Sequence, residues 1–89
     1  MMECQFLQLW VDLLAARADG RTAILANFDA FEKSAREDKN GNFADMAVTA
    51  KWIADSVRVG KAAKVNESEL YQPREARLFL AAMGIRFEP

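Results

Sequence analysis

Residues 43–60 have the sequence FADMAVTAKWIADSVRVG, and this stretch decides the fold. Its apolar side chains recur at the spacing that places them on one face of an α-helix. The members of this face are Phe43, Met46, Ala47, Ala50, Ile53, Ala54 and Val57. The pattern predicts a helix over residues 43–59 that ends at Gly60, because glycine readily adopts the left-handed conformation that closes many helices.

Two further helices are predicted before this stretch. Residues 3–18 lack glycine and proline, and Gly20 follows at the place where a left-handed residue often closes a helix. The apolar face of this helix is too wide to pack against one neighbour. Residues 22–38 have the narrower apolar face of an amphipathic helix that covers a core.

A fourth helix is predicted over residues 73–83. Proline at the first helical position loses no intrahelical hydrogen bond, so Pro73 suits its start, and Gly84 suits its end. Strand signals are weak throughout, with residues 85–88 the only short candidate. The sequence therefore predicts a single all-α domain over residues 1–89, either a small four-helix bundle or an orthogonal helical array.

The connections carry turn and capping signals. Residues 40–42, Asn-Gly-Asn, tolerate positive φ and predict a tight turn, and Asn42 with Asp45 resembles a capping box at the start of the third helix. Residues 60–72 are predicted to be a connection with one helical turn near Glu67. We also expect Ile85 to contact the preceding helix and Phe87 to continue as an extended tail against the bundle.

Composition limits the classes of function. The chain has a net charge of −1, with −3 on residues 1–50 and +2 on residues 51–89, so no strong field attracts nucleic acid or anionic lipid. No apolar run approaches the length of a membrane span, and no signal segment is evident. Cys4 is the single cysteine and cannot form an internal disulfide, which favours a reducing, cytoplasmic location.

Several chemistries lack the residues that they need. The chain contains no histidine and one cysteine, which removes the commonest general base and any structural zinc site. A calcium-binding loop over residues 36–47 fails, because with Gly41 at its sixth position the first and last ligands are Arg36 and Ala47. We therefore expect no cofactor, no metal and no enzymatic activity.

Surplus apolar residues favour a protein-binding role. Val48, Trp52 and Val59 form a strip outside the main apolar face of residues 43–59, and the wide face of residues 3–18 adds Trp10 and Leu14. Such surplus surface is typical of interfaces, so these five residues are the candidate contacts with another protein or with a second copy in a homodimer. Core packing is favoured for Trp10, and the sequence leaves Trp52 open between core and interface.

The leading hypothesis is thus a small interaction module that inhibits or regulates a larger protein assembly. Phage and mobile-element inhibitors share its size and its lack of catalytic residues, which is a comparison by class alone. The alternative is a helical nucleic-acid-binding regulator that uses the basic groups Lys51, Arg58, Lys61, Lys64, Arg74 and Arg77. The acidic isoelectric point of about 5.4 weighs against this alternative.

Overall fold

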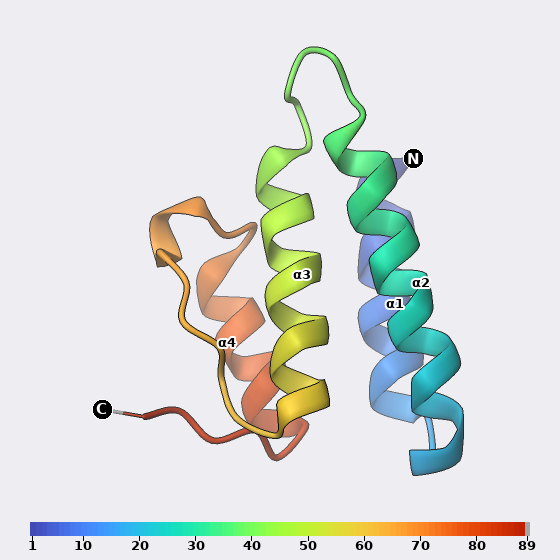
Figure 1. Cartoon of the computed structure of the whole chain (residues 1–89), viewed down its shortest axis with the longest axis vertical. Coiled ribbons are helices and arrows are strands. Elements are labelled where there is room, and N and C mark those ends of the chain that lie inside the picture. The colour runs from blue at the N-terminus through green and yellow to red at the C-terminus, as the bar shows by residue number, and fades with distance from the viewer. Residues whose placement is uncertain (89) are drawn as a thin grey trace.

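The computed structural model describes residues 1–88 and is an all-α bundle (Figure 1). Four α-helices and one short 3₁₀-helix make up its regular structure over these residues. Their bounds are α1 Met2–Ala15, α2 Ala18–Arg36, α3 Ala44–Val59, η1 Glu67–Glu69 and α4 Pro73–Ala82. The predicted fold class is confirmed, and each predicted helix is present. Within the described chain, no helix combines the length and the apolar character needed to cross a membrane.

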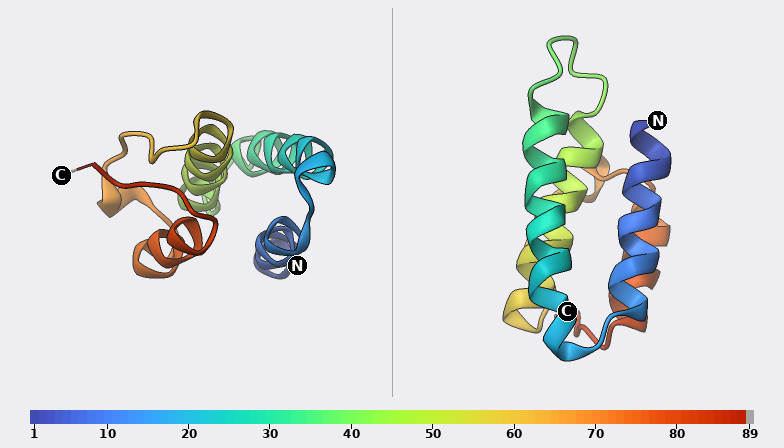
Figure 2. Two further views of the ribbon diagram at one scale, coloured as in Figure 1. Left: turned by 90° about the horizontal axis from the view of Figure 1, so that it is seen from below. Right: turned by 90° about the vertical axis from the view of Figure 1, so that its right-hand side faces the viewer.

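The four α-helices run roughly lengthwise, which makes the fold a bundle rather than an orthogonal array (Figure 1). Consecutive helices α1, α2 and α3 alternate in direction, whereas α4 runs in the same direction as α3. The connection over residues 60–72 makes this possible, because it returns along the outside of the bundle. Seen end on, the helices occupy the corners of a square with α4 beside α1, and the connection and the C-terminal tail lie outside α3 and α4 (Figure 2).

Aromatic side chains fill the centre of the bundle. The ring of Phe6 is fully buried, stacks on Phe31 with 4.7 Å between ring centroids, and meets the edges of Trp10 and Phe28 at 5.5 and 6.2 Å. Trp10 in turn lies 5.2 Å from Phe79 of α4. Helix α1 therefore packs against both α2 and α4, and two neighbours account for the wide apolar face that the sequence shows.

The boundary between α1 and α2 differs from the prediction. Helix α1 ends at Ala15, and the chain turns through Ala16 and Arg17, both in the extended conformation. Gly20 lies inside the first turn of α2, where its amide donates to the carbonyl of Arg17 at 2.9 Å. The prediction that Gly20 closes the first helix is wrong, because an extended exit needs no left-handed residue.

The turn between α2 and α3 is present, but its capping box is not. Helix α3 begins after Phe43, which makes no side-chain cap, and Asp45 accepts a hydrogen bond from the adjacent amide of Met46. The carboxylate of Asp38 organises the turn instead, since it accepts from the amide of Asn42 at 2.9 Å. The turn retains the predicted left-handed glycine, with φ of 68° at Gly41.

The ends of α3 and α4 are as predicted. Gly60 closes α3 with φ of 90°. At the end of α4, Gly84 has φ of 79°, and the amide of Ile85 donates to the carbonyl of Leu80 at 3.0 Å, which is a Schellman cap. Ile85 is buried with Leu80 in the core. The chain therefore leaves α4 in a fixed direction, toward the outer face of α3.

Candidate functional site

Side chains of α3 fix the path of the long connection. Two polar residues of α3 are fully buried, Thr49 and Ser56, and each accepts a hydrogen bond from the connection. The amide of Tyr71 donates to Thr49 Oγ1 at 2.7 Å, and the amide of Ala63 donates to Ser56 Oγ at 2.9 Å. The indole Nε1 of Trp52 also donates to the carbonyl of Ala63, at 2.7 Å. The connection is thus anchored along α3 at two separate points.

The C-terminal tail is held against the same connection. The amide of Ala62 donates to the carbonyl of Arg86 at 2.7 Å, so Lys61 and Arg86 form an isolated parallel β-bridge. The sequence shows a weak strand signal over residues 85–88, and in the structure this segment forms this one bridge. The half-buried ring of Phe87 lies 6.3 Å from Trp52, and the guanidinium of Arg77 lies 4.5 Å from the Phe87 centroid. The predicted packing of Phe87 on the bundle is confirmed.

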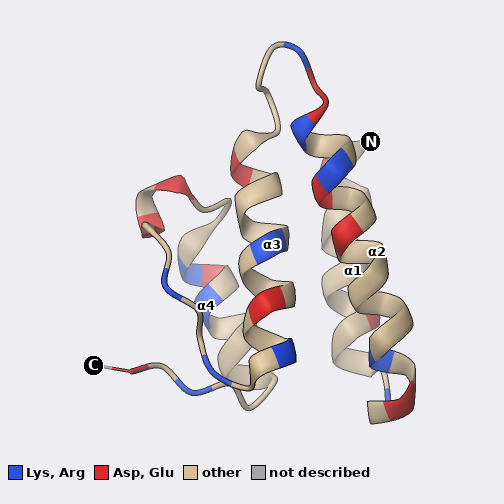
Figure 3. Ribbon diagram, in the orientation of Figure 1, with Lys and Arg blue, Asp and Glu red and all other residues tan. Residues whose placement is uncertain are grey.

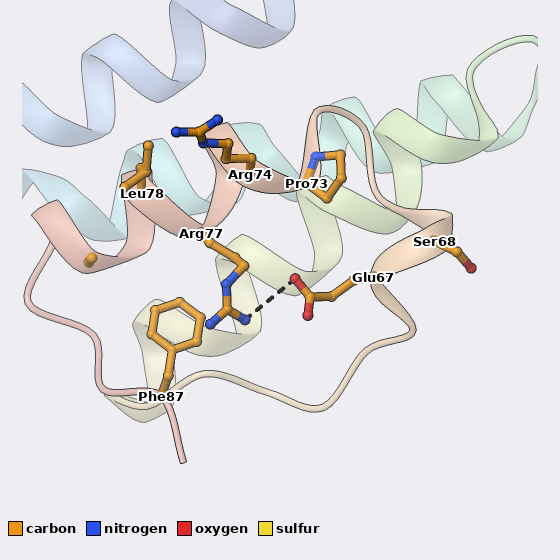
Figure 4. Close-up of a pocket in the computed structure, with 8 residues that line it drawn as sticks. Glu67, Ser68, Pro73, Arg74, Arg77, Leu78 and Phe87 are labelled. Atoms are coloured by element: carbon orange, nitrogen blue, oxygen red, sulfur yellow. Dashed lines mark ion pairs between the residues drawn. The ribbon is translucent and has the colours of Figure 1, made fainter. Parts of the chain in front are cut away.

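Three neighbouring hollows follow this outer face, and we call them together the basic track. The first, of about 710 Å³, lies between α4, η1 and the tail and is lined by Glu67, Ser68, Pro73, Arg74, Arg77, Leu78, Ala81 and Phe87 (Figure 4). The second, of about 600 Å³, is lined by Trp52, Lys61, Ala62, Ala63, Lys64, Val65, Glu67, Arg77, Phe87 and Glu88. The third, of about 190 Å³, is lined by Arg36, Val48, Lys51, Trp52, Asp55, Ala63, Lys64 and Val65.

The hollows share walls and therefore form one continuous surface. Glu67, Arg77 and Phe87 separate the first from the second, and Figure 4 shows the Arg77 side chain between the other two. Trp52 and the segment 63–65 separate the second from the third. Because α3 anchors the connection through hydrogen bonds, this surface is set by tertiary structure and not by any one element.

The basic track carries an excess of positive charge. Six cationic and three acidic side chains line it, in a chain whose net charge is −1. Figure 3 shows the same grouping, with blue segments on the connection, the tail and α4. Four of the cations have partners: Arg36 pairs with Glu32 at 2.7 Å, Lys51 with Asp55 at 3.1 Å, Lys61 with Glu88 at 3.2 Å and Arg77 with Glu67 at 3.4 Å.

Three cations on this side lack such a partner. Lys64 and Arg74 line the track and Arg86 lies on the tail beside it, and none of the three has a carboxylate of residues 1–88 within ion-pair distance. All three are exposed. Exposed ion pairs contribute only about 0–1 kcal/mol each, so the existing pairs on the track are also open to exchange with charges of a ligand.

The structure separates the predicted interface residues. Trp10 and Trp52 are core side chains, with exposed fractions of 7% and 4%. This settles the question that the sequence leaves open for Trp52: its indole is a floor of the track, and little of it faces solvent. Val48 is half-buried and lines the third hollow, whereas Leu14 and Val59 are exposed and line none of the three.

Among the apolar residues of the track that sequence reasoning missed, Leu78 and Phe87 have the largest side chains. Leu78 is 62% exposed and Phe87 is half-buried, and both line the first hollow. The sequence contained a signal that Leu78 is exposed. Ala76 and Phe79 of α4 are three residues apart and share the buried face, whereas Leu78, two residues after Ala76, lies on the opposite side of the helix. No signal in the sequence brings Phe87 beside α4, since this contact depends on the path of the tail.

The predicted basic residues mostly come together. Five of the six line the track, namely Lys51, Lys61, Lys64, Arg74 and Arg77. Arg58 does not. It bridges α3 to α2 by two hydrogen bonds to Asp29, at 3.1 and 2.6 Å, and the bond from Arg58 holds the pKa of the Asp29 carboxyl below its usual value. Arg58 therefore serves the α2–α3 contact.

The described residues hold no cluster of metal-ligating side chains. Within residues 1–88, no three side chains among His, Cys, Asp and Glu lie together as a metal-ion site would require. Cys4 is exposed and lines none of the three hollows. The site is thus a basic groove with apolar walls on a small helical bundle, a geometry suited to binding. No family model, curated protein or solved structure matches the chain.

Proposed function

We propose that the protein is a non-enzymatic interaction module that binds another protein through the basic track. The continuous surface of three hollows, apolar at its α4 end and cationic along its length, supports this role. Apolar pockets that take a side chain of the partner, with polar residues around them, are typical of protein interfaces. Binding by such a module blocks or repositions a surface of its partner, so the proposed role is an inhibitor or regulator that acts in the cytoplasm.

Nucleic-acid binding is less well supported by the same surface. Three of the cations pair with Asp55, Glu67 and Glu88 on the track itself, and these carboxylates repel phosphates that follow a regular backbone spacing. Single strands also need exposed aromatic faces for stacking. Here Trp52 is buried and Arg77 covers one side of Phe87.

Site-specific photo-crosslinking in the producing cells tests the proposed function. A benzophenone amino acid replaces Leu78 in the first hollow, and a matched variant carries it at Val11, an exposed apolar residue of α1 that lines no hollow. We expect a discrete protein adduct from position 78 that is absent from position 11. The absence of an adduct at position 78, or equal adducts at both positions, would rule out the track as the binding surface.

A further inference from the structure

We infer that the basic track binds an acidic polypeptide segment whose apolar side chain enters the hollow between α4 and the tail. This inference rests on the proposed function and adds the chemistry of the partner. It depends on two features of the same surface, which are an apolar hollow at one end and cations along it that have no ion-pair partner among residues 1–88.

The apolar hollow has room for a large side chain. Its walls include Pro73, Leu78, Ala81 and the ring of Phe87, and its volume is about 710 Å³. Leu78 is 62% exposed. The residues that bury α4 against the core are Ala76, Phe79 and Leu80, so Leu78 remains available for a partner. An apolar side chain of a partner would remove this surface from water, which is the main source of affinity at most protein interfaces.

The cations select for carboxylates. Lys64, Arg74 and Arg86 have no acidic partner among residues 1–88, and Lys61 and Arg77 have exposed partners that a ligand can replace. An arginine binds a carboxylate through two parallel hydrogen bonds, which fixes geometry as well as charge. In Figure 4, Arg74 extends past the hollow on the side of Leu78, and Arg77 lies toward Phe87. Carboxylates on either side of an apolar anchor would therefore meet both arginines.

A polypeptide fits this mixed charge better than a nucleic acid does. Glu67 and Glu88 interrupt the cations on the track. A peptide can place neutral side chains opposite these carboxylates, whereas a nucleic acid brings a phosphate at every nucleotide. A second copy of the chain fits less well. Val11 and Leu14 of α1 are exposed apolar residues that a second copy could place in the hollow. The carboxylate between them belongs to Asp12, which is half-buried and accepts from Gln8 at 2.9 Å.

The test uses short synthetic peptides and the full chain labelled for NMR. One peptide is rich in aspartate and glutamate and contains leucine. A second replaces its acids by asparagine and glutamine, a third replaces its leucines by serine, and a single-stranded oligonucleotide of equal charge is the fourth probe. We expect the acidic leucine peptide to shift amide resonances of α4, the connection and the tail. Its affinity should exceed that of the second and third peptides by roughly tenfold and should weaken with salt.

Charge-reversal variants locate the binding. Lys64→Glu with Arg74→Glu should weaken the acidic leucine peptide by roughly tenfold or more. Arg17→Glu with Lys39→Glu makes the same change of charge at exposed positions that line no hollow, and should leave the affinity unchanged. All four side chains are exposed, and far-ultraviolet circular dichroism checks that both variants fold.

Three results would overturn the inference: equal binding of the neutral peptide, tighter binding of the oligonucleotide, or a dimer in light scattering that Leu78→Glu dissolves. The crosslinking result decides separately whether the proposed function is wrong. A crosslinked partner at position 78 together with no preference for the acidic peptide would overturn the inference alone. Peptide binding as expected, together with no adduct in cells, would overturn the proposed function and leave the surface chemistry standing.

Discussion

Replacing Trp52 by phenylalanine tests how the basic track is built. The indole Nε1 of Trp52 donates to the carbonyl of Ala63 at 2.7 Å and so holds the connection on α3. Phenylalanine keeps an aromatic ring but cannot donate. The matched control is Trp10→Phe, because Trp10 is as buried as Trp52, with exposed fractions of 7% and 4%, and its Nε1 has no hydrogen-bond partner in residues 1–88.

The two substitutions should differ in cost by about 2–4 kcal/mol. Both remove the same atoms from a buried site, so the loss of packing largely cancels in the comparison. Trp52→Phe also loses a hydrogen bond with a net value of about 1 kcal/mol. Trp10→Phe removes a buried donor without an acceptor, which relieves a penalty of about 1–3 kcal/mol. A domain of 89 residues has a total stability of roughly 4–13 kcal/mol, so both variants should still fold.

Urea unfolding followed by circular dichroism measures this difference, and the melting temperatures should differ by about 4–8 °C per kcal/mol. Amide hydrogen exchange gives a second measure, since Ala62 and Ala63 should lose protection in Trp52→Phe alone. If Trp10→Phe costs as much as Trp52→Phe, the bond to Ala63 contributes nothing beyond packing. The account of how the connection is anchored would then be wrong.

Three further substitutions test other parts of the fold. Thr49→Val keeps its shape but leaves the amide of Tyr71 without its acceptor, and should cost about 1–3 kcal/mol in urea unfolding, whereas Thr22→Val on the exposed face of α2 should stay within about 0.5 kcal/mol. Gly20→Ala should raise the free energy of unfolding by roughly 0.5–1 kcal/mol, because Gly20 is helical and a Cβ there meets only Ala16, at 4.0 Å; a loss would mean that α2 begins later. Burial, followed by the hydrogen bond to Glu3, raises the pKa of Tyr71 from 10.0 to about 12, so the folded state favours the neutral phenol, and stability present below pH 10 should fall as the pH rises toward 12. Tyr71→Phe should flatten this alkaline loss, and an unchanged pH profile would contradict the assignment.

Much of the bundle could be predicted from the chain because its signals are local. The periodicity of residues 43–59 and the left-handed glycines at positions 60 and 84 act within one turn of helix, so they determine the same structure in any context. The two errors at helix boundaries have a common cause. Gly20 and the pair Asn42 and Asp45 carry residue types that occur at helix ends, but other conformations satisfied the backbone there.

The candidate site was predicted less completely, because its members are far apart in the chain. The sequence shows five of the basic residues that line the track, since they lie close together in the chain, between Lys51 and Arg77. It does not show that Arg58 turns to Asp29 on α2, or that Phe87 lies beside Arg77. Both contacts join segments that only the packed bundle brings together.

The sequence by itself determined the helices, their order and the excess of charge on the C-terminal half. Local hydrogen bonding and apolar periodicity suffice for these properties. The tertiary structure alone decided that Trp52 is buried and that Lys61 and Ala62 pair with Arg86 of the tail. These outcomes depend on Trp52 and Ser56 satisfying the backbone of Ala63, a requirement that exists only once α3 and the connection are in contact.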